Sequence, residues 1–184
     1  RRKMDFFNEN LVQRKKTGKD VAIIIGIILL GIILTCALLL FLLGMPIVGQ
    51  FFLLLIAGVW FLAYRLISGR KVEFEYIVTN SDMDVDKIVA KRKRTRILSL
   101  NAKEIEIMAP VNDPDFQREQ QNVNIVERMD ISSGNPEARR YFAVFMREGK
   151  RTMIIFEPTR KMLAIFKRYR PQDVHLAPED VAEL

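Results

Sequence analysis

The sequence predicts a membrane-embedded helical hairpin followed by a mainly antiparallel α+β domain, with seven strands and one C-terminal helix. Three observations predict this class. Residues 21–43 contain no charged side chain, residues 51–68 form a second apolar run, and from residue 71 apolar and polar side chains alternate with a period of two. The chain therefore divides into an N-terminal segment, a hairpin, a domain and a tail, with predicted bounds 1–20, 21–68, 69–170 and 171–184.

The first apolar run, 21–43, is long enough to cross a hydrocarbon core of about 30 Å as a helix rising about 1.5 Å per residue. It is too long for the apolar region of a signal peptide, and it lacks the polar stripe of a soluble core helix. The second span is expected over about 47–68. Its Arg65 lies close to the end, where a long side chain reaches the headgroups, and Trp60 and Tyr64 lie in the same final turns.

Basic residues flank the two spans on one side only. The segment 1–20 holds seven basic residues and three acidic ones, whereas the connector 44–50 holds no charge. The positive-inside rule therefore puts both termini in the cytoplasm and the connector outside, as in a multi-pass protein of the cell membrane. The residues expected to anchor the spans at the membrane surface are Lys15, Lys16, Lys19, Trp60, Tyr64, Arg65 and Arg70.

The formal net charge of +7 belongs mainly to these flanks. Residues 69–184 hold 21 basic and 19 acidic side chains, so the domain itself has little excess charge to attract a nucleic acid. We therefore expect no nucleic-acid partner. The single cysteine, Cys36, lies within the first span and has no partner for an intramolecular disulfide.

The domain is expected to begin with strands and end with a helix. Thr159 is a suitable N-cap, and Met162, Leu163, Phe166 and Tyr169 follow at helical spacing over 159–170. Pro171 ends this helix, and the residues after it are expected to form a loose tail. The predicted strands are 71–79, 83–90, 96–100, 103–111, 123–132, 139–148 and 151–158.

The N-terminal segment leaves two structures open. Residues 4–20 place Phe6, Phe7, Leu11 and Val12 beside a basic cluster, which favours an interfacial amphipathic helix leading into the first span. The alternative is an unstructured basic flank that only sets the topology. Met4 is a candidate for the true start of the chain.

The stretch EYIVTNSDMDVDKIVAKRKRTRILSLNAKEIEIM resembles the opening of bacterial pleckstrin-homology-like (PH-like) domains that follow membrane hairpins. Tyr76, Val78, Thr79 and Asn80 match the end of their first strand. The residues 97–100 are similar to their Ile-Pro-Leu element, with Ser99 in place of the proline. The resemblance implies a bacterial membrane family with two N-terminal spans and one cytoplasmic PH-like domain, built as a barrel or sandwich with a helix at one end. It implies no activity.

A basic stretch lies between the second and third predicted strands. Its cations admit three functions: a solvated hairpin tip that protects a sheet edge, a contact with anionic lipid headgroups, or a nucleic-acid patch. The third lacks interleaved aromatic residues. Because only a few residues separate the second span from the first strand, the domain is held near the membrane in every case. The candidate headgroup contacts are Lys91, Arg92, Lys93, Arg94 and Arg96.

The sequence shows no catalytic constellation, and we expect neither a cofactor nor a metal. His175 stands alone in the tail, and the alternating Asp82, Asp84 and Asp86 lack the glycine and distal glutamate of a calcium loop. The expected function is therefore non-enzymatic: a protein-interaction or scaffold module at the inner membrane face, using a strand edge or the groove beside the C-terminal helix. The alternative is a headgroup-binding module. The protein partner and the oligomeric state stay open.

Overall fold

A computed structural model of the chain describes residues 7–44 and 49–181. The connector predicted at 44–50 and the start of the N-terminal segment thus lie largely outside the described residues. The chain forms two compact units. A hairpin unit comprises Lys16–Val72 and Val89–Lys91, and a β-rich unit comprises residues 7–15, Glu73–Ile88 and 92–181.

The hairpin unit contains the two longest helices, α1 (Gly18–Gly44) and α2 (Gly49–Ser68). The most apolar stretches, Gly18–Phe41 and Phe51–Ser68, have mean hydropathies of 3.2 and 2.0, and only 6% and 11% of their residues are buried. Both helices are therefore long and apolar enough to cross a membrane. They begin and end as the predicted spans do, within a few residues.

Polar contacts occur where α1 begins and α2 ends, and one of them joins the two helices. Thr17 caps α1, because its hydroxyl accepts from the Asp20 amide while the Asp20 carboxylate accepts from the Thr17 amide at 3.1 Å. The same carboxylate lies 3.5 Å from the Arg70 guanidinium, just beyond α2. Further along the pair, the Trp60 ring lies over Gly31, where an added Cβ would approach the ring to 3.8 Å. Trp60 is thus a helix-packing residue as well as a partly exposed one.

The β-rich unit contains two four-stranded sheets, so the strands form a sandwich and not a single closed barrel. The described residues include eight strands, not the seven predicted. The first sheet has the order β1 (Phe7–Gln13), β2 (Val72–Thr79), β3 (Asp82–Val89), β4 (Lys93–Asn101). The second has the order β5 (Ile105–Pro110), β7 (Tyr141–Arg147), β8 (Lys150–Phe156), β6 (Glu127–Asp130). Strands β6 and β8 pair in parallel, whereas β1 with β2, β5 with β7, and β7 with β8 pair antiparallel.

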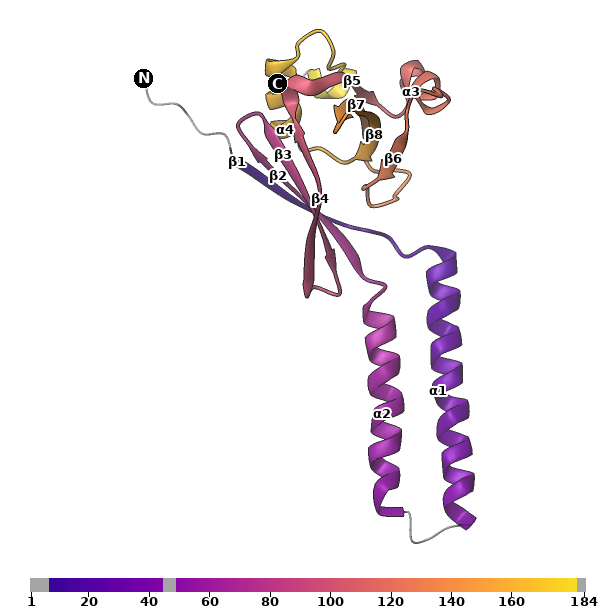
Figure 1. The fold of residues 1–184 in the computed structure, drawn as a ribbon. Helices are drawn as coiled ribbons and strands as arrows, with labels where there is room; N and C mark the ends of the chain where they lie inside the picture. Colours follow the sequence, from indigo (N-terminus) through magenta and orange to yellow (C-terminus); the bar gives the residue numbers. More distant parts are fainter. Residues whose placement is uncertain (1–6, 45–48, 182–184) are drawn as a thin grey trace. The chain divides into compact units, whose positions relative to one another are not determined.

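The additional strand is β1, and the helix expected over 4–20 is wrong for its described part. Strand β1 pairs antiparallel with β2 from Phe7↔Thr79 to Gln13↔Glu73 (Figure 1). Its side chains alternate, with Val12 buried and Leu11 exposed. The helical hairpin is therefore an insertion between two paired strands, and a domain boundary at residue 69 cuts off the first strand.

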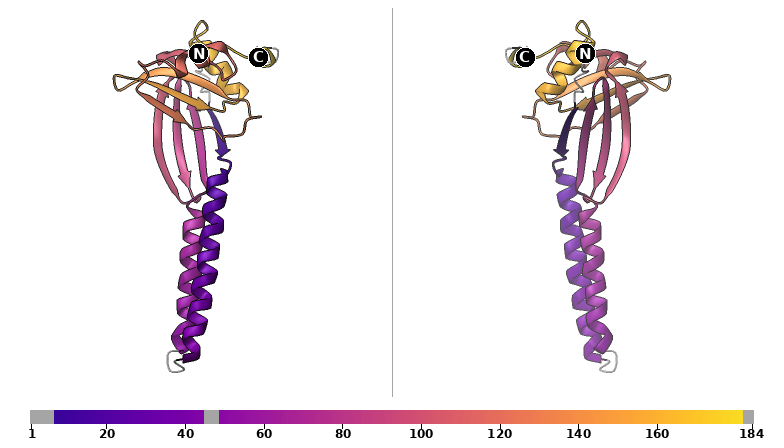
Figure 2. Two further views of the ribbon diagram at one scale, coloured as in Figure 1. Left: turned by 90° about the vertical axis from the view of Figure 1, so that its right-hand side faces the viewer. Right: turned by 90° about the vertical axis from the view of Figure 1, so that its left-hand side faces the viewer.

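Helix α4 (Arg160–Tyr169) packs on the core of the sandwich. It begins after Thr159, whose hydroxyl accepts from the Met162 amide at 3.3 Å. Phe166 on α4 meets Phe156 on β8 edge-to-face at 6.3 Å, and Phe156 meets Tyr76 on β2 at 6.0 Å. These rings connect α4 with both sheets. In Figure 2, α4 lies on the side of the unit that carries β1.

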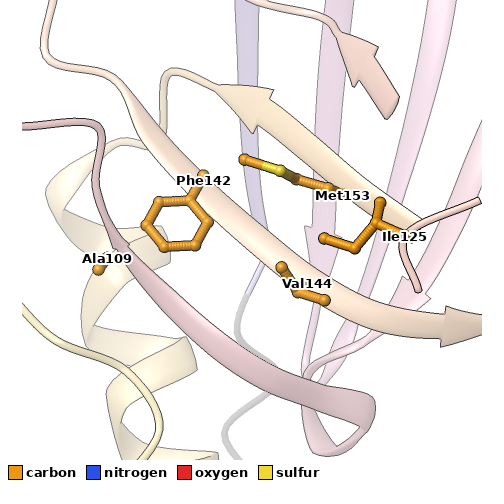
Figure 3. Close-up of a cluster of buried hydrophobic side chains, with 5 residues drawn as sticks. All are labelled: Ala109, Ile125, Phe142, Val144 and Met153. Atoms are coloured by element: carbon orange, nitrogen blue, oxygen red, sulfur yellow. The ribbon is translucent and has the colours of Figure 1, made fainter. Parts of the chain in front are cut away.

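The second sheet also buries apolar side chains on its other face, where Phe142 contacts Phe116 of α3 (Pro114–Gln120) at 5.4 Å. Because both faces are covered, strand β7 is buried from Tyr141 to Phe145 without alternation. A short 3-10 turn, Ala102–Glu104, links the two sheets. The side chains that form this second cluster are Ala109, Ile125, Phe142, Val144 and Met153 (Figure 3).

The loose tail predicted from residue 171 is wrong for the described part of that segment. Val174 is buried and bridges to Met108, and the chain then forms a final turn, α5 (Pro178–Val181). Asp180 in this turn is buried against the Tyr141 hydroxyl, which donates to its carboxylate at 2.5 Å. The domain therefore continues to at least residue 181.

Candidate functional site: a groove between strand β1 and helix α4

A groove of about 480 Å³ lies between the edge strand β1 and helix α4. Phe7 on β1, which is 64% exposed, lines one wall, and Ala164 and Ile165 of α4 line the other. The groove is concave and largely apolar, as binding sites usually are. Its lining residues are Phe7, Asn8, Lys161, Ala164, Ile165, Arg168 and Tyr169.

Helical periodicity divides α4 between the core and the groove. Met162 and Phe166 face the core and are fully buried. Lys161, Ala164 and Arg168 recur at intervals of three and four and face the groove. The sequence predicted the buried side of this helix and proposed a groove beside it, but nothing in the pattern indicated that β1 would form the opposite wall.

Strand β1 has one edge free of backbone pairing. It is the terminal strand of its sheet, and among residues 7–44 and 49–181 its seven residues make backbone hydrogen bonds to β2 alone. Besides this pairing, hydrogen bonds from its side chains hold β1 in place. The Asn8 amide donates to the Thr159 hydroxyl, and the Asn10 amide donates to the Glu157 carbonyl at 3.2 Å. An edge of this kind can pair with an added strand.

A second, more polar hollow of about 760 Å³ shares Asn8 and Lys161 with the groove. It runs along β1 past Asn10 and Val12 to Ser133. The Ser133 hydroxyl donates to the Glu157 carboxylate at 2.6 Å, so this wall is already internally bonded. The two hollows together follow the length of β1.

The basic stretch proposed for headgroup contact divides into two groups. Arg94 and Arg96 lie on β4 and bind carboxylates of neighbouring strands, with Arg94 2.8 Å from Glu75 and Arg96 2.5 Å from Asp84. Arg96 also donates to Asp86 at 2.8 Å, and this bond raises the pKa of the guanidinium. Lys91, Arg92 and Lys93 are exposed in the turn before and at the start of β4.

Two carboxylates on this face of the first sheet, those of Glu75 and Asp86, are buried. Glu75 is 4% exposed, and burial, followed by a hydrogen bond with Glu9, raises its pKa although Arg94 opposes the shift. Asp82 accepts from the Asn101 amide and Asp84 from the Ser99 hydroxyl. The alternating aspartates are thus engaged with strand β4 and its end. No group of three or more His, Cys, Asp or Glu side chains able to hold a metal occurs in the part of the chain described.

The residues predicted to flank the spans lie near the ends of the helices, apart from Trp60. Lys16 and Lys19 are exposed beside the start of α1, and Arg65 is exposed in the last turn of α2. The Lys15 amide donates to the Ser133 carbonyl at 2.7 Å, within the β-rich unit. Tyr64 is 56% exposed. Cys36 is exposed on α1, and His175 lies 3.8 Å from Asp115.

Comparison with known families identifies the fold. Residues 4–176 match the family described as Bacterial PH-like domain (DUF6106). The chain belongs to this family, and the match begins before β1 and ends beyond α4, so it spans both units. No curated protein matches the chain, and no solved structure does.

Proposed function

We propose that this member of the bacterial PH-like family is a non-enzymatic, two-span membrane protein whose PH-like domain binds an extended segment of a partner protein. The observation that carries the proposal is the groove between β1 and α4, with an unpaired strand edge along one side. The module acts as a scaffold at the inner face of the cell membrane.

The membrane assignment rests on the exposure of the two helices. A soluble core helix of this hydropathy is buried by its neighbours, whereas α1 and α2 leave most of their apolar side chains uncovered. Leu40 is 71% exposed and Leu53 is 78% exposed. Lipid is the environment that accommodates such surfaces. The basic flanks at Lys16, Lys19 and Arg65 favour a cytoplasmic location for both termini.

The mode of recognition follows from the two walls. An added strand would bond to the free edge of β1, and every second side chain would then point toward α4. Ala164 leaves room for an apolar side chain there. Lys161 is exposed at the junction of the two hollows and favours an acidic residue in the same segment. The occupant is therefore an extended segment that combines acidic and apolar side chains.

The test places a photo-activated crosslinking residue at Ala164 of the full chain in its native membrane. We expect adducts whose crosslinked peptide, identified by mass spectrometry, contains an acidic residue near an apolar one. Adduct yield should fall when Lys161→Glu is added. The control is the same crosslinker at Val123, which is 92% exposed on the loop after α3. Equal adducts from both positions, or adducts indifferent to Lys161→Glu, contradict binding in the groove.

A further inference from the structure

The turn between β3 and β4 is bonded to the chain just beyond α2. The amide of Ala90 donates to the carbonyl of Lys71 at 2.8 Å, and both residues belong to the hairpin unit. Lys71 follows the end of α2 at Ser68 by three residues. This bond fixes the start of the turn beside the end of a helix that is apolar enough to span a membrane.

The same turn adopts a backbone conformation that its residues disfavour. Ala90 and Lys91 have φ angles of 53° and 57°, in the left-handed region that glycine and asparagine adopt most readily. A tight hairpin turn with two positive φ angles normally carries Asn-Gly or Gly-Gly. Lys91 therefore occupies a position where glycine would stabilise the turn.

The cations of this turn differ from the other basic residues of the stretch. Arg94 and Arg96 are neutralised by carboxylates, and Arg70 pairs with Asp20. Lys71, Lys91, Arg92 and Lys93 are exposed, and no carboxylate of the described residues pairs with them.

We propose that Lys71, Lys91, Arg92 and Lys93 contact the phosphate groups of anionic lipids at the membrane surface where α2 ends. The inference rests on the proposed membrane insertion of the hairpin and adds a site to it. The lipid, and not a free phosphate, is the ligand, because Lys71 and Lys91 belong to the unit whose two helices are apolar enough to enter a bilayer, and Arg92 and Lys93 follow Lys91 directly in the chain. Each cation near an anionic leaflet raises the equilibrium constant for contact about fivefold, so two cations together raise it about thirtyfold.

The experiment uses the full chain in nanodiscs of phosphatidylcholine, with or without phosphatidylglycerol. Cys36 is replaced by alanine and a nitroxide is attached at Thr95→Cys, an exposed site on β4 near the turn. Nickel-chelating headgroups then report how closely the label approaches the lipid surface. We expect closer approach in anionic discs, lost between about 0.1 M and about 1 M salt as the Debye length shrinks from about 10 Å to about 3 Å.

Two variants separate charge from structure. Arg92→Gln with Lys93→Gln should weaken the preference for anionic lipid by about thirtyfold. The matched pair Lys103→Gln with Lys150→Gln, also exposed, should leave it unchanged. Lys91→Gly should weaken the contact while raising the unfolding temperature, because it relieves the positive φ angle. A purely structural turn would gain stability without any change in lipid approach.

The outcomes are distinguishable from failure of membrane insertion. A nitroxide on the native Cys36 of α1 reports hydrocarbon directly, through its accessibility to oxygen. If that label enters the bilayer but the Thr95 label approaches neutral and anionic discs equally, or the Arg92 and Lys93 variants behave as the native chain does, the headgroup site is overturned. If the Cys36 label stays in water, membrane insertion is refuted and the headgroup site with it.

Discussion

Removing the Tyr141 hydroxyl tests whether the C-terminal turn is part of the folded domain. Tyr141 is fully buried, and its hydroxyl donates to Asp180 at 2.5 Å and accepts from the Ala177 amide at 3.0 Å. Asp180, 1% exposed, also pairs with Arg139. The Tyr141 hydroxyl therefore connects strand β7 with Ala177, just before α5, and with Asp180, inside α5.

The structure sets the size of the effect. Tyr141→Phe removes one hydrogen bond to a charged acceptor and one from a backbone amide, and it leaves the amide unsatisfied. Such a loss costs about 2–3 kcal/mol. At about 3 °C per kcal/mol for a domain of this size, the unfolding temperature should fall by about 6–9 °C. Asp180→Ala should cost a similar amount, because Arg139 is partly exposed and water can replace its lost partner.

The loss should depend on pH in a defined direction. Burial, with the Asp180 hydrogen bond adding to it, raises the pKa of Tyr141 from 10.0 to about 12. The folded state therefore favours the neutral phenol, so the stabilisation is complete below pH 10 and is lost as pH rises from 10 to about 12. The stability difference between the native chain and Tyr141→Phe should shrink over that range. Burial also raises the pKa of Tyr76, whose contribution remains in both proteins.

The assay combines thermal unfolding of the full chain in detergent with hydrogen exchange of the peptide around Asp180. The amides of Asp180 and Val181 bond to the Ala177 carbonyl, so their protection reports the final turn. Tyr169→Phe is the matched control, because Tyr169 is half-buried and its hydroxyl makes no hydrogen bond within the described residues. Unchanged exchange at Asp180 in Tyr141→Phe, or an equal effect of the control, would refute the reasoning.

Two further predictions concern the first sheet. Glu75→Gln should raise the urea midpoint of unfolding at pH 8 more than at pH 4. Burial raises the pKa of Glu75, so ionising this carboxyl in the folded state costs stability as the pH rises. A lower midpoint at pH 8 would show instead that the ion pair between Glu75 and Arg94 dominates. Replacing residues 14–72 with Asn-Gly should give a folded domain that is soluble in water, because Gln13 and Glu73 are already paired as the last residues of a hairpin are. Aggregation of the shortened chain, measured by light scattering, would contradict the pairing of β1 with β2.

Local patterns predicted most elements of the fold. An uncharged run of the right length indicated α1, and alternation indicated β2 and β5. The seven predicted strands correspond to β2 to β8, with bounds that differ from the structure by a few residues. The spacing of Met162, Leu163 and Phe166 indicated the buried side of α4. These signals lie within a single element, and burial of one face is what creates them.

Strand β1 and the final turn could not be predicted in the same way. FNENLVQ contains two asparagines, which strands disfavour, and its partner β2 lies beyond the whole hairpin in sequence. Pairing with β2 and the bonds of Asn8 and Asn10 to residues 157–159, just before α4, define it. The final turn is four residues long, and a contact with Tyr141 defines it. Both depend on long-range partners, which periodicity does not report.

The same limitation affected the candidate sites. Nothing in the sequence distinguished the five cations of the basic stretch from one another as lipid contacts. In the structure, however, Arg94 and Arg96 form ion pairs with carboxylates on other strands. The groove needed both β1 and α4, which lie at opposite ends of the chain.

The insertion of the hairpin between β1 and β2 connects these findings. If the whole domain came after the two helices in the sequence, one linker would join it to them. Here the chain leaves the first sheet after Gln13 and returns to it at Val72. Two adjacent strands, β1 and β2, are therefore each connected to one of the helices. The strand that leads into α1 is also the wall of the groove. A segment added to the edge of β1 would therefore bind directly to the strand that enters the first apolar helix. If the hairpin inserts into the membrane as proposed, this arrangement would favour partners at the membrane surface over partners free in solution.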